Sequence, residues 1–127
     1  MNKVVIGIGS NIAPGENIRK ARIILAQKYN VLAESEFVTT QPIGNAAQPD
    51  FINGAVLIET QATYEQLAKE LKVIEQQLGR RESTDKFAPR MIDLDIVVLN
   101  GKITDQDFHN RDFLKNAVLE VLPTLKY

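Results

Sequence analysis

Apolar and polar residues alternate along this chain with two different periods, and the change of period separates strands from helices. Short β-branched runs bounded by glycine, proline or asparagine indicate strands, whereas apolar residues that recur every three or four positions indicate amphipathic helices. Phe37 and Val38 are the clearest part of the second strand. The patterns predict strands at 4–8, 31–40, 51–59 and 94–99, helices at 16–28 and 63–78, and a short final helix within 111–122.

The second helix carries the strongest local signals. Thr63 and Gln66 form a capping-box pattern, in which each side chain satisfies an early backbone N–H group. Gly79 is well placed to end the helix in the left-handed conformation. Between these ends one apolar stripe follows a single helix face: Leu67, Leu71, Ile74 and Leu78. After the last strand, the pair Asn100-Gly101 predicts a tight turn.

The predicted order of elements is β-α-β-β-α-β, followed by the short C-terminal helix. This order is typical of an α+β, ferredoxin-like sandwich, in which two helices pack on one face of an antiparallel sheet. A chain of 127 residues fits one domain, so we expect residues 1–127 to form a single one. Because this fold supports many functions, the chemistry has to be inferred from the side chains.

The amino-acid composition excludes or disfavours several kinds of functional site. The chain has no cysteine and one histidine, His109, which excludes disulfides and thiolate sites and disfavours multi-histidine zinc sites. A net charge of −1 argues against a broad surface for nucleic acid or anionic membranes. No apolar run approaches the roughly 20 residues that cross a bilayer, and the first residues do not resemble a secretory signal. We therefore expect a soluble, cytoplasmic protein; the sequence does not indicate protein partners.

Asp93 and Asp95 lie two positions apart at the start of the last strand. Side chains two apart on a strand point to the same face, so these carboxylates lie side by side. Like charges repel each other unless a cation lies between them, and ligands that are all oxygen favour Mg²⁺. The simpler alternative is a pair of solvated acids on an exposed sheet face.

A basic segment directly precedes this acidic pair, and its cationic residues are Arg80, Arg81, Lys86 and Arg90. Guanidinium groups bind phosphate oxygens through two hydrogen bonds at once. Carboxylates beside cations fit phosphoryl-type transfer, which needs positioning and charge neutralisation more than a nucleophilic side chain. The alternative is a solvated surface segment that pairs partly with Glu82 and Asp85. The chain contains neither GxxxxGK[ST] nor GxGxxG, so side chains and metal would have to hold the phosphates.

A planar organic substrate needs aromatic faces and amide edges. Phe51 and Phe87 are candidates for the faces, and Asn53, two residues after Phe51, shares its side of the strand. Phe51 also fits a place in the core. A phenylalanine in a polar loop, such as Phe87, has less reason to be there unless it covers a ligand.

Four segments of the chain resemble the 6-hydroxymethyl-7,8-dihydropterin pyrophosphokinase family of the folate pathway. They are residues 9–11 (GSN), 48–53 (QPDFIN), 74–80 and 86–97 (KFAPRMIDLDIV), and the likeness extends from residue 3 to about residue 100. The resemblance implies a ferredoxin-like sandwich. It also implies transfer of pyrophosphate from ATP to the hydroxymethyl group of a reduced pterin, with release of AMP.

The resemblance implies roles for individual residues. Asp93 and Asp95 would hold two Mg²⁺ ions that bridge the triphosphate and the attacking hydroxyl group. Together with Arg80, on a loop that closes over ATP, and Arg90, which steadies the phosphates, they would form the catalytic set. The residues implied to line the pterin slot are Thr40, Ile43, Phe51, Asn53, Phe87 and Phe113. Those implied to contact ATP are Lys72, Glu75, Arg80, Arg90, Ile96 and Arg111.

Two departures from the family pattern fall on the nucleotide side. Glu82 stands where the family often has an arginine, and a Pro-His segment that contacts ATP is missing after Asn100-Gly101. The leading hypothesis is an active pyrophosphokinase with fewer ATP contacts. The alternatives are a catalytically impaired paralogue that binds pterin or nucleotide without turnover, and an interaction module with the same fold.

Overall fold

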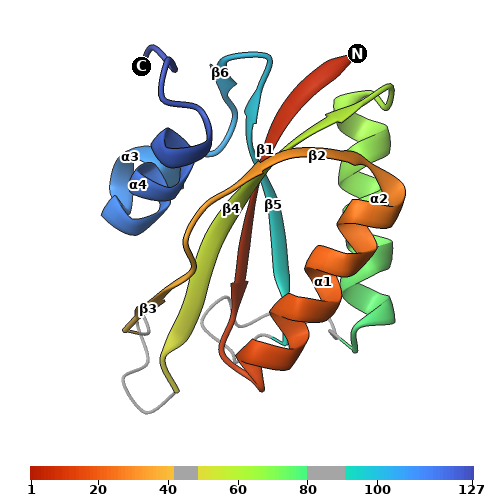
Figure 1. Cartoon of the computed structure of the whole chain (residues 1–127), viewed down its shortest axis with the longest axis vertical. Helices are drawn as coiled ribbons and strands as arrows, with labels where there is room; N and C mark the ends of the chain where they lie inside the picture. The colour runs from red at the N-terminus through yellow and green to blue at the C-terminus, as the bar shows by residue number, and fades with distance from the viewer. Residues whose placement is uncertain (42–48, 80–90) are drawn as a thin grey trace.

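The computed structural model describes residues 1–41, 49–79 and 91–127. Within these ranges, strands and helices alternate largely as the sequence pattern predicts (Figure 1). The elements are β1 (Asn2–Ser10), α1 (Pro14–Lys28), β2 (Asn30–Glu34), β3 (Val38–Thr40), β4 (Phe51–Thr60), α2 (Tyr64–Gln77), β5 (Asp93–Leu99), β6 (Lys102–Ile103), α3 (Asp107–Asn110) and α4 (Asp112–Val121).

The strands form one antiparallel sheet in the order β2-β4-β1-β5-β6. β3 pairs with the beginning of β4, from Phe51 to Asn53. β1 is the central strand: it pairs with β4 on one side and with β5 on the other. Its residues from Val4 to Ser10 are all buried, because both sheet faces are covered there. The predicted α+β sandwich with an antiparallel sheet is therefore confirmed.

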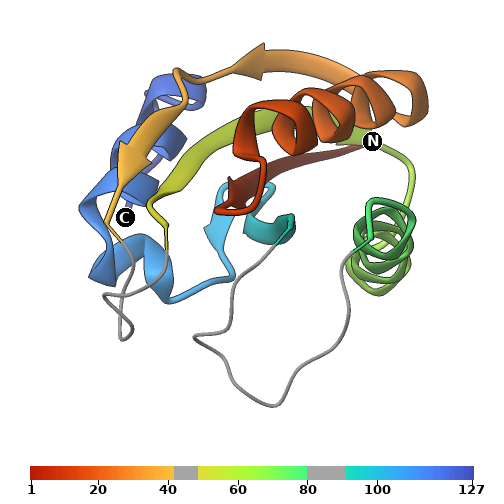
Figure 2. The same cartoon turned by 90° about the horizontal axis from the view of Figure 1, so that it is seen from below.

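The two faces of the sheet are covered by different helices (Figures 1 and 2). α1 and α2 pack on one face, where Leu25 and Leu71 join Ile6 in the larger core. α3 and α4 pack on the opposite face, where Phe108 and Val118 lie in a second apolar cluster. The helix pair on one face is as predicted, whereas the sequence pattern does not say where the C-terminal helix packs.

The second predicted strand is interrupted. The structure divides residues 31–40 into β2 and β3, and Phe37 belongs to neither strand. Ser35 accepts a hydrogen bond from Ala55 N through its hydroxyl oxygen (2.8 Å), so a side chain replaces a backbone partner at this point. Phe37 packs over Gly54, where a Cβ atom would lie 2.5 Å from the phenyl ring. The prediction that Phe37 is a clear strand residue is therefore wrong, because its ring packs against β4 from outside the ladder.

The local signals are confirmed. At the start of α2, Gln66 N donates to Thr63 Oγ1 (3.2 Å) and Thr63 N donates to Gln66 Oε1 (2.9 Å), which completes the capping box. Gly79 follows the helix with φ 95°, in the left-handed region. Asn100 and Gly101 have φ values of 48° and 82° and turn the chain from β5 into β6.

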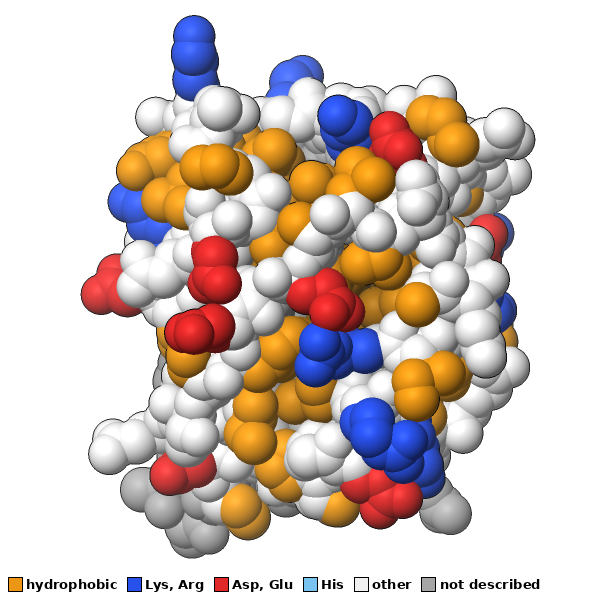
Figure 3. Space-filling view, viewed as in Figure 1, with side chains coloured by type: hydrophobic (Ala, Val, Ile, Leu, Met, Phe, Trp, Pro, Cys, Tyr) orange, Lys and Arg blue, Asp and Glu red, His pale blue; other side chains and the backbone are white. Residues whose placement is uncertain are grey.

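Polar side chains also tie α1 to its neighbours. Tyr29, just after α1, donates a hydrogen bond to Glu70 of α2 (2.5 Å), and its burial together with this bond raises the pKa of the phenol. Arg22 pairs with Glu34 of β2 (2.6 Å), and the hydrogen bond lowers the pKa of that carboxyl group. On the side of the molecule seen in Figure 1, Figure 3 shows charges of both signs among apolar side chains, with basic side chains gathered over α1. No helix among the described residues is long and apolar enough to span a bilayer.

Candidate active site

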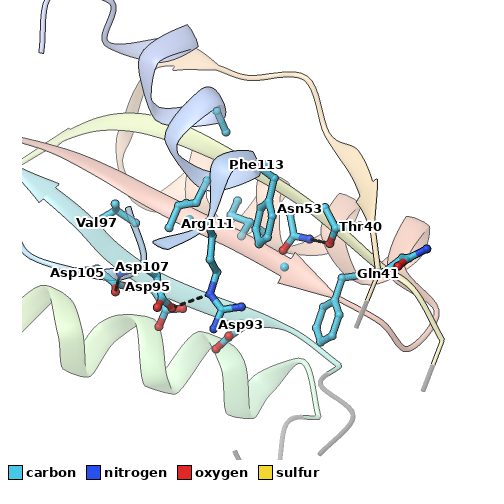
Figure 4. A pocket seen from close by; sticks show the side chains of 17 residues that line it. Thr40, Gln41, Asn53, Asp93, Asp95, Val97, Asp105, Asp107, Arg111 and Phe113 are labelled. Atoms are coloured by element: carbon cyan, nitrogen blue, oxygen red, sulfur yellow. Dashed lines mark hydrogen bonds and ion pairs between the residues drawn. The ribbon is translucent and has the colours of Figure 1, made fainter. Parts of the chain in front are cut away.

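A pocket of about 480 Å³ lies on the sheet face that α3 and α4 cover (Figure 4). Its floor is formed by β1, β4 and β5, and its wall by the segment from Asp105 to Ala117. It gathers seven residues that the sequence predicts for the site: Thr40, Phe51, Asn53, Asp93, Asp95, Arg111 and Phe113. Residues from four strands and the C-terminal helices therefore meet in one cavity.

One end of the pocket, which we call the amide end, is built around Asn53. Its Nδ2 donates a hydrogen bond to Thr40 Oγ1 (2.6 Å) across the β3–β4 pair. Its Oδ1 lies over Gly9 of β1, where a Cβ atom would come within 2.6 Å of that oxygen. Thr40 thus holds the side chain, and a residue larger than glycine at position 9 would displace it. Phe51 and Phe113 line the same pocket and can supply apolar surface to a flat ligand.

The other end, which we call the carboxylate end, begins with Asp93 and Asp95 on β5. The residues opposite them on β1 are Gly9 and Gly7, so no side chain from the central strand covers the two acids. Both carboxylates face the pocket, as the alternation of the strand predicts. Asp93 is partly buried and Asp95 is exposed.

Asp105, Asp107 and Arg111 complete the carboxylate end (Figure 4). Asp107 N donates to Asp105 Oδ1 (2.9 Å), and Arg111 Nε lies 3.4 Å from Asp107 Oδ2. Arg111 also lines the pocket, and its contact with ATP stays a prediction. Sequence reasoning missed the two additional acids, and the one usable signal was that Asp107 stands four residues before Arg111 on a helical segment.

Three residues implied to contact ATP lie away from this pocket. Lys72 is exposed on α2, whereas Ile96 and Glu75 are buried between α2 and the sheet. Glu75 is only 7% exposed, and its Oε2 accepts a hydrogen bond from the backbone N–H of Leu94 (2.7 Å). The structure thus brings the acidic pair together with four of the residues implied for the pterin slot, but it does not bring these three to the same cavity. Their contacts with ATP stay predictions.

Four further predicted residues, Ile43, Arg80, Phe87 and Arg90, lie outside the described residues.

The carboxylate end fits Mg²⁺ in its chemistry. The donors are carboxylate oxygens with no histidine or cysteine beside them in the pocket, and Mg²⁺ is commonly held by one or two carboxylates together with substrate phosphates. Among the described residues, no three histidine, cysteine, aspartate or glutamate side chains converge as a complete metal-binding group.

Comparison with known proteins places these observations in a family. The family model described as 7,8-dihydro-6-hydroxymethylpterin-pyrophosphokinase matches residues 5–123. The chain is 30% identical to the 2-amino-4-hydroxy-6-hydroxymethyldihydropteridine pyrophosphokinase of Haemophilus influenzae, over 94% of this chain and 81% of that protein. It is 29% identical to the Helicobacter pylori protein of the same name, over 84% of this chain and 68% of that protein. The folate synthesis bifunctional protein of Arabidopsis thaliana is 35% identical over 75% of this chain, which corresponds to 20% of that longer protein. The resemblance found in the sequence is confirmed, and the chain belongs to the 7,8-dihydro-6-hydroxymethylpterin-pyrophosphokinase family.

Proposed function

We propose that residues 1–127 form a single domain and that this domain transfers pyrophosphate from ATP to the hydroxymethyl group of 6-hydroxymethyl-7,8-dihydropterin, as a step in folate biosynthesis. The observation that carries this proposal is one pocket with two chemically different ends. Asn53 at the amide end suits the edge of a heterocycle, and Asp93 and Asp95 at the carboxylate end suit metal-bound phosphates. Membership of the pyrophosphokinase family supports the same reaction. We further propose that the reaction takes place in the cytoplasm.

In the proposed reaction the hydroxyl oxygen of the pterin attacks the β-phosphorus of ATP. The bond between the β-phosphorus and the oxygen that bridges it to the α-phosphorus breaks, AMP leaves, and the hydroxyl proton is released to solvent. Such transfers depend on alignment and charge neutralisation more than on covalent catalysis by the protein.

The residues of this chain divide that work. Asn53, held by Thr40, would orient the pterin, and Phe51 and Phe113 would bound the flat ring. Asp93 and Asp95 would hold Mg²⁺, and we infer two ions there. When bound, the metal would supply the positive charge that neutralises the phosphates. Arg111 would attract the phosphates from the α3–α4 side, and Arg80 and Arg90 are proposed as further phosphate contacts.

The proposal is tested by product analysis. Purified protein is incubated with ATP, Mg²⁺ and 6-hydroxymethyl-7,8-dihydropterin, and nucleotides and pterins are separated by chromatography. We expect AMP and pterin diphosphate in equal amounts, and neither product when the pterin is omitted. ADP with a pterin monophosphate would overturn the proposed reaction.

The same preparation tests the non-catalytic alternative. Calorimetry with the pterin and a non-hydrolysable ATP analogue measures binding without turnover. Binding of either ligand together with a complete lack of AMP formation would support the impaired paralogue. An absence of binding to both ligands would support the interaction module.

A further inference from the structure

Glu75 has surroundings that are unusual for an acidic side chain. It lies on the face of α2 that packs against the sheet, next to Ile74 and one turn from Leu71, both of which are at most 2% exposed. A carboxylate in such a place is costly unless hydrogen-bond donors compensate for the water it has lost. The backbone N–H of Leu94 is one such donor, at 2.7 Å from Glu75 Oε2.

The hydrogen bond reaches β5 at a position where, among the described residues, the strand is paired on one side only. β5 pairs with β1 along its length, but β6 pairs only with Val98 and Leu99 at its far end. At Leu94 the outer edge of β5 therefore has no paired strand among the described residues. A backbone N–H at such an edge needs a partner from elsewhere, and the Glu75 side chain supplies it.

The bonded N–H belongs to the residue between the two acids of the carboxylate end. Asp93 and Asp95 flank Leu94, so the bond fixes the strand backbone at the midpoint of the pair. The directions of the two carboxylates follow from that backbone, because neighbouring strand residues point to opposite faces. Leu94 faces the core beneath α2, and both acids line the pocket.

A second buried side chain holds the chain just before β5. Ser10, at the end of β1 and fully buried, donates a hydrogen bond through its hydroxyl to Met91 O (2.5 Å). The approach to the acidic pair is thus fixed at Met91 by β1 and at Leu94 by α2. The bond from Glu75 is charge-assisted, and such bonds are stronger than those between neutral groups.

We propose that Glu75 is a positioning residue for the proposed cation site: by holding Leu94 N–H, it fixes the geometry in which Asp93 and Asp95 present their carboxylates. This role differs from the ATP contact that the family resemblance implies for Glu75. It rests on the proposed function, since it requires the two acids to bind a divalent cation. Groups that orient metal-binding carboxylates typically change metal affinity by about 10- to 100-fold when they are removed.

Three substitutions separate the hydrogen bond from the charge. Glu75→Gln keeps an acceptor oxygen at the same reach and removes the charge. Glu75→Asp keeps the charge but withdraws the oxygen by one methylene group. Glu75→Leu removes the acceptor and keeps the bulk. Leu71→Ala is the control for lost packing. Leu71 lies on the same buried stripe of α2, but its side chain has no polar atom that could accept a hydrogen bond from Leu94 N–H.

Mn²⁺ serves as the probe, because the signal of the free ion in electron paramagnetic resonance falls when the ion is bound. The titration is carried out with the non-hydrolysable ATP analogue present, and the denaturant midpoint of each variant is measured alongside. We expect Glu75→Asp and Glu75→Leu to weaken Mn²⁺ binding by about tenfold or more. Glu75→Gln and Leu71→Ala should stay within about threefold of wild type, although Leu71→Ala should lower the denaturant midpoint because it leaves a cavity in the core.

Wild-type Mn²⁺ affinity in both Glu75→Asp and Glu75→Leu would overturn the positioning role while leaving the proposed function intact. Equal losses in Glu75→Gln and Glu75→Leu would also overturn it, because charge rather than the hydrogen bond would then matter. If Glu75→Leu does not fold, Glu75→Asp decides between these outcomes. Wild-type protein that neither binds Mn²⁺ nor forms AMP would instead show that the proposed function itself fails.

Discussion

The two ends of the pocket are built by different physical means. At the amide end, a neutral hydrogen bond from Asn53 to Thr40 and the missing side chain of Gly9 fix one amide group. At the carboxylate end, four acidic side chains line the cavity: Asp93, Asp95, Asp105 and Asp107. Neutral hydrogen bonds act over contact distances, whereas the forces among charges extend further and respond to ions.

This difference indicates how the ends divide the reaction. The amide end is held by a hydrogen bond within the protein, so it suits recognition of the pterin. The carboxylate end concentrates negative charge, so its acids are best accommodated with cations among them. Changes at the amide end should therefore act mainly on the KM for pterin. Changes at the carboxylate end should act on kcat, on metal dependence and on ATP.

The largest effect is expected from Asp95→Asn. The amide is nearly the same size but lacks the charge that would hold a divalent cation, so we expect kcat to fall on the order of 10³-fold. Asp95 is exposed on β5, so the denaturant midpoint should change little. AMP formation and urea unfolding measure the two quantities. Glu65→Gln, an exposed change in the first turn of α2, is the matched control and should keep wild-type turnover.

Near-normal turnover in Asp95→Asn would contradict the proposed difference between the two ends, because the carboxylate end would then have no special role. A large loss of stability in that variant, with activity per folded molecule unchanged, would also contradict it. The carboxylate would then serve the fold rather than the reaction.

Phe113→Ala is expected to have the next largest effect, and this effect should fall on the pterin. Stacking of a heterocycle on an aromatic ring contributes about 1–3 kcal/mol, so the KM for pterin should rise by about 5- to 150-fold. The KM for ATP should change by less than about threefold. Steady-state kinetics with each substrate varied separately measure the split. Phe113→Leu keeps apolar bulk without a ring face, so full rescue by leucine would show that stacking is not involved.

Gly9→Ala tests the fixed geometry of the amide end. The added methyl group would lie 2.6 Å from Asn53 Oδ1, and the amide would have to turn away from it and from Thr40. Loss of one well-placed hydrogen bond to the ligand should raise the KM for pterin by about 5- to 30-fold. Stability should fall little, because the obstructing atom is at the end of a side chain that can move.

Gly15→Ala is the matched control for that experiment. Gly15 lies in the first turn of α1, and a Cβ atom there meets nothing within 4 Å. We expect unchanged kinetics and a gain in stability of about 0.4–1 kcal/mol, since alanine restricts the unfolded chain. Equal effects of the two substitutions on pterin kinetics would contradict a special role for Gly9.

The sequence predicts best those features that depend on neighbouring residues. The capping box of α2 and the turn at Asn100-Gly101 are decided within a few positions of the chain, and both are present. The facing carboxylates of Asp93 and Asp95 follow from strand alternation alone, and both acids line the pocket.

Features that depend on distant contacts are harder to predict. The interruption at Ser35 comes from its bond to Ala55, which is 20 residues away. The contact from Glu75 to Leu94 spans 19 residues, and the helical pattern alone does not show which partner a buried acid will find. Asp105 and Asp107 enter the pocket only because the β5–β6 hairpin and α3 bring them back over β5.

The smallest expected effect comes from Asp107→Asn, which removes one charge from the carboxylate end. The Arg111–Asp107 pair (3.4 Å) is 31% and 47% exposed, so breaking it should cost less than about 1 kcal/mol of stability. Arg111 would then be available to phosphate, and the pocket would repel ATP less. We expect the KM for ATP to fall by about two- to fivefold at low salt, and the difference to shrink at high salt because ions screen the charge.

Glu16→Gln is the matched control, because it breaks a similar pair between residues four apart on a helix, Lys20–Glu16 (3.2 Å), on α1 and outside the pocket. It should cost as little stability as Asp107→Asn and leave the KM for ATP unchanged. A higher KM for ATP in Asp107→Asn would mean that Asp107 holds Arg111 in its phosphate-binding position instead of competing for it. The carboxylate end would then resemble the amide end, with a geometry fixed before ligands bind.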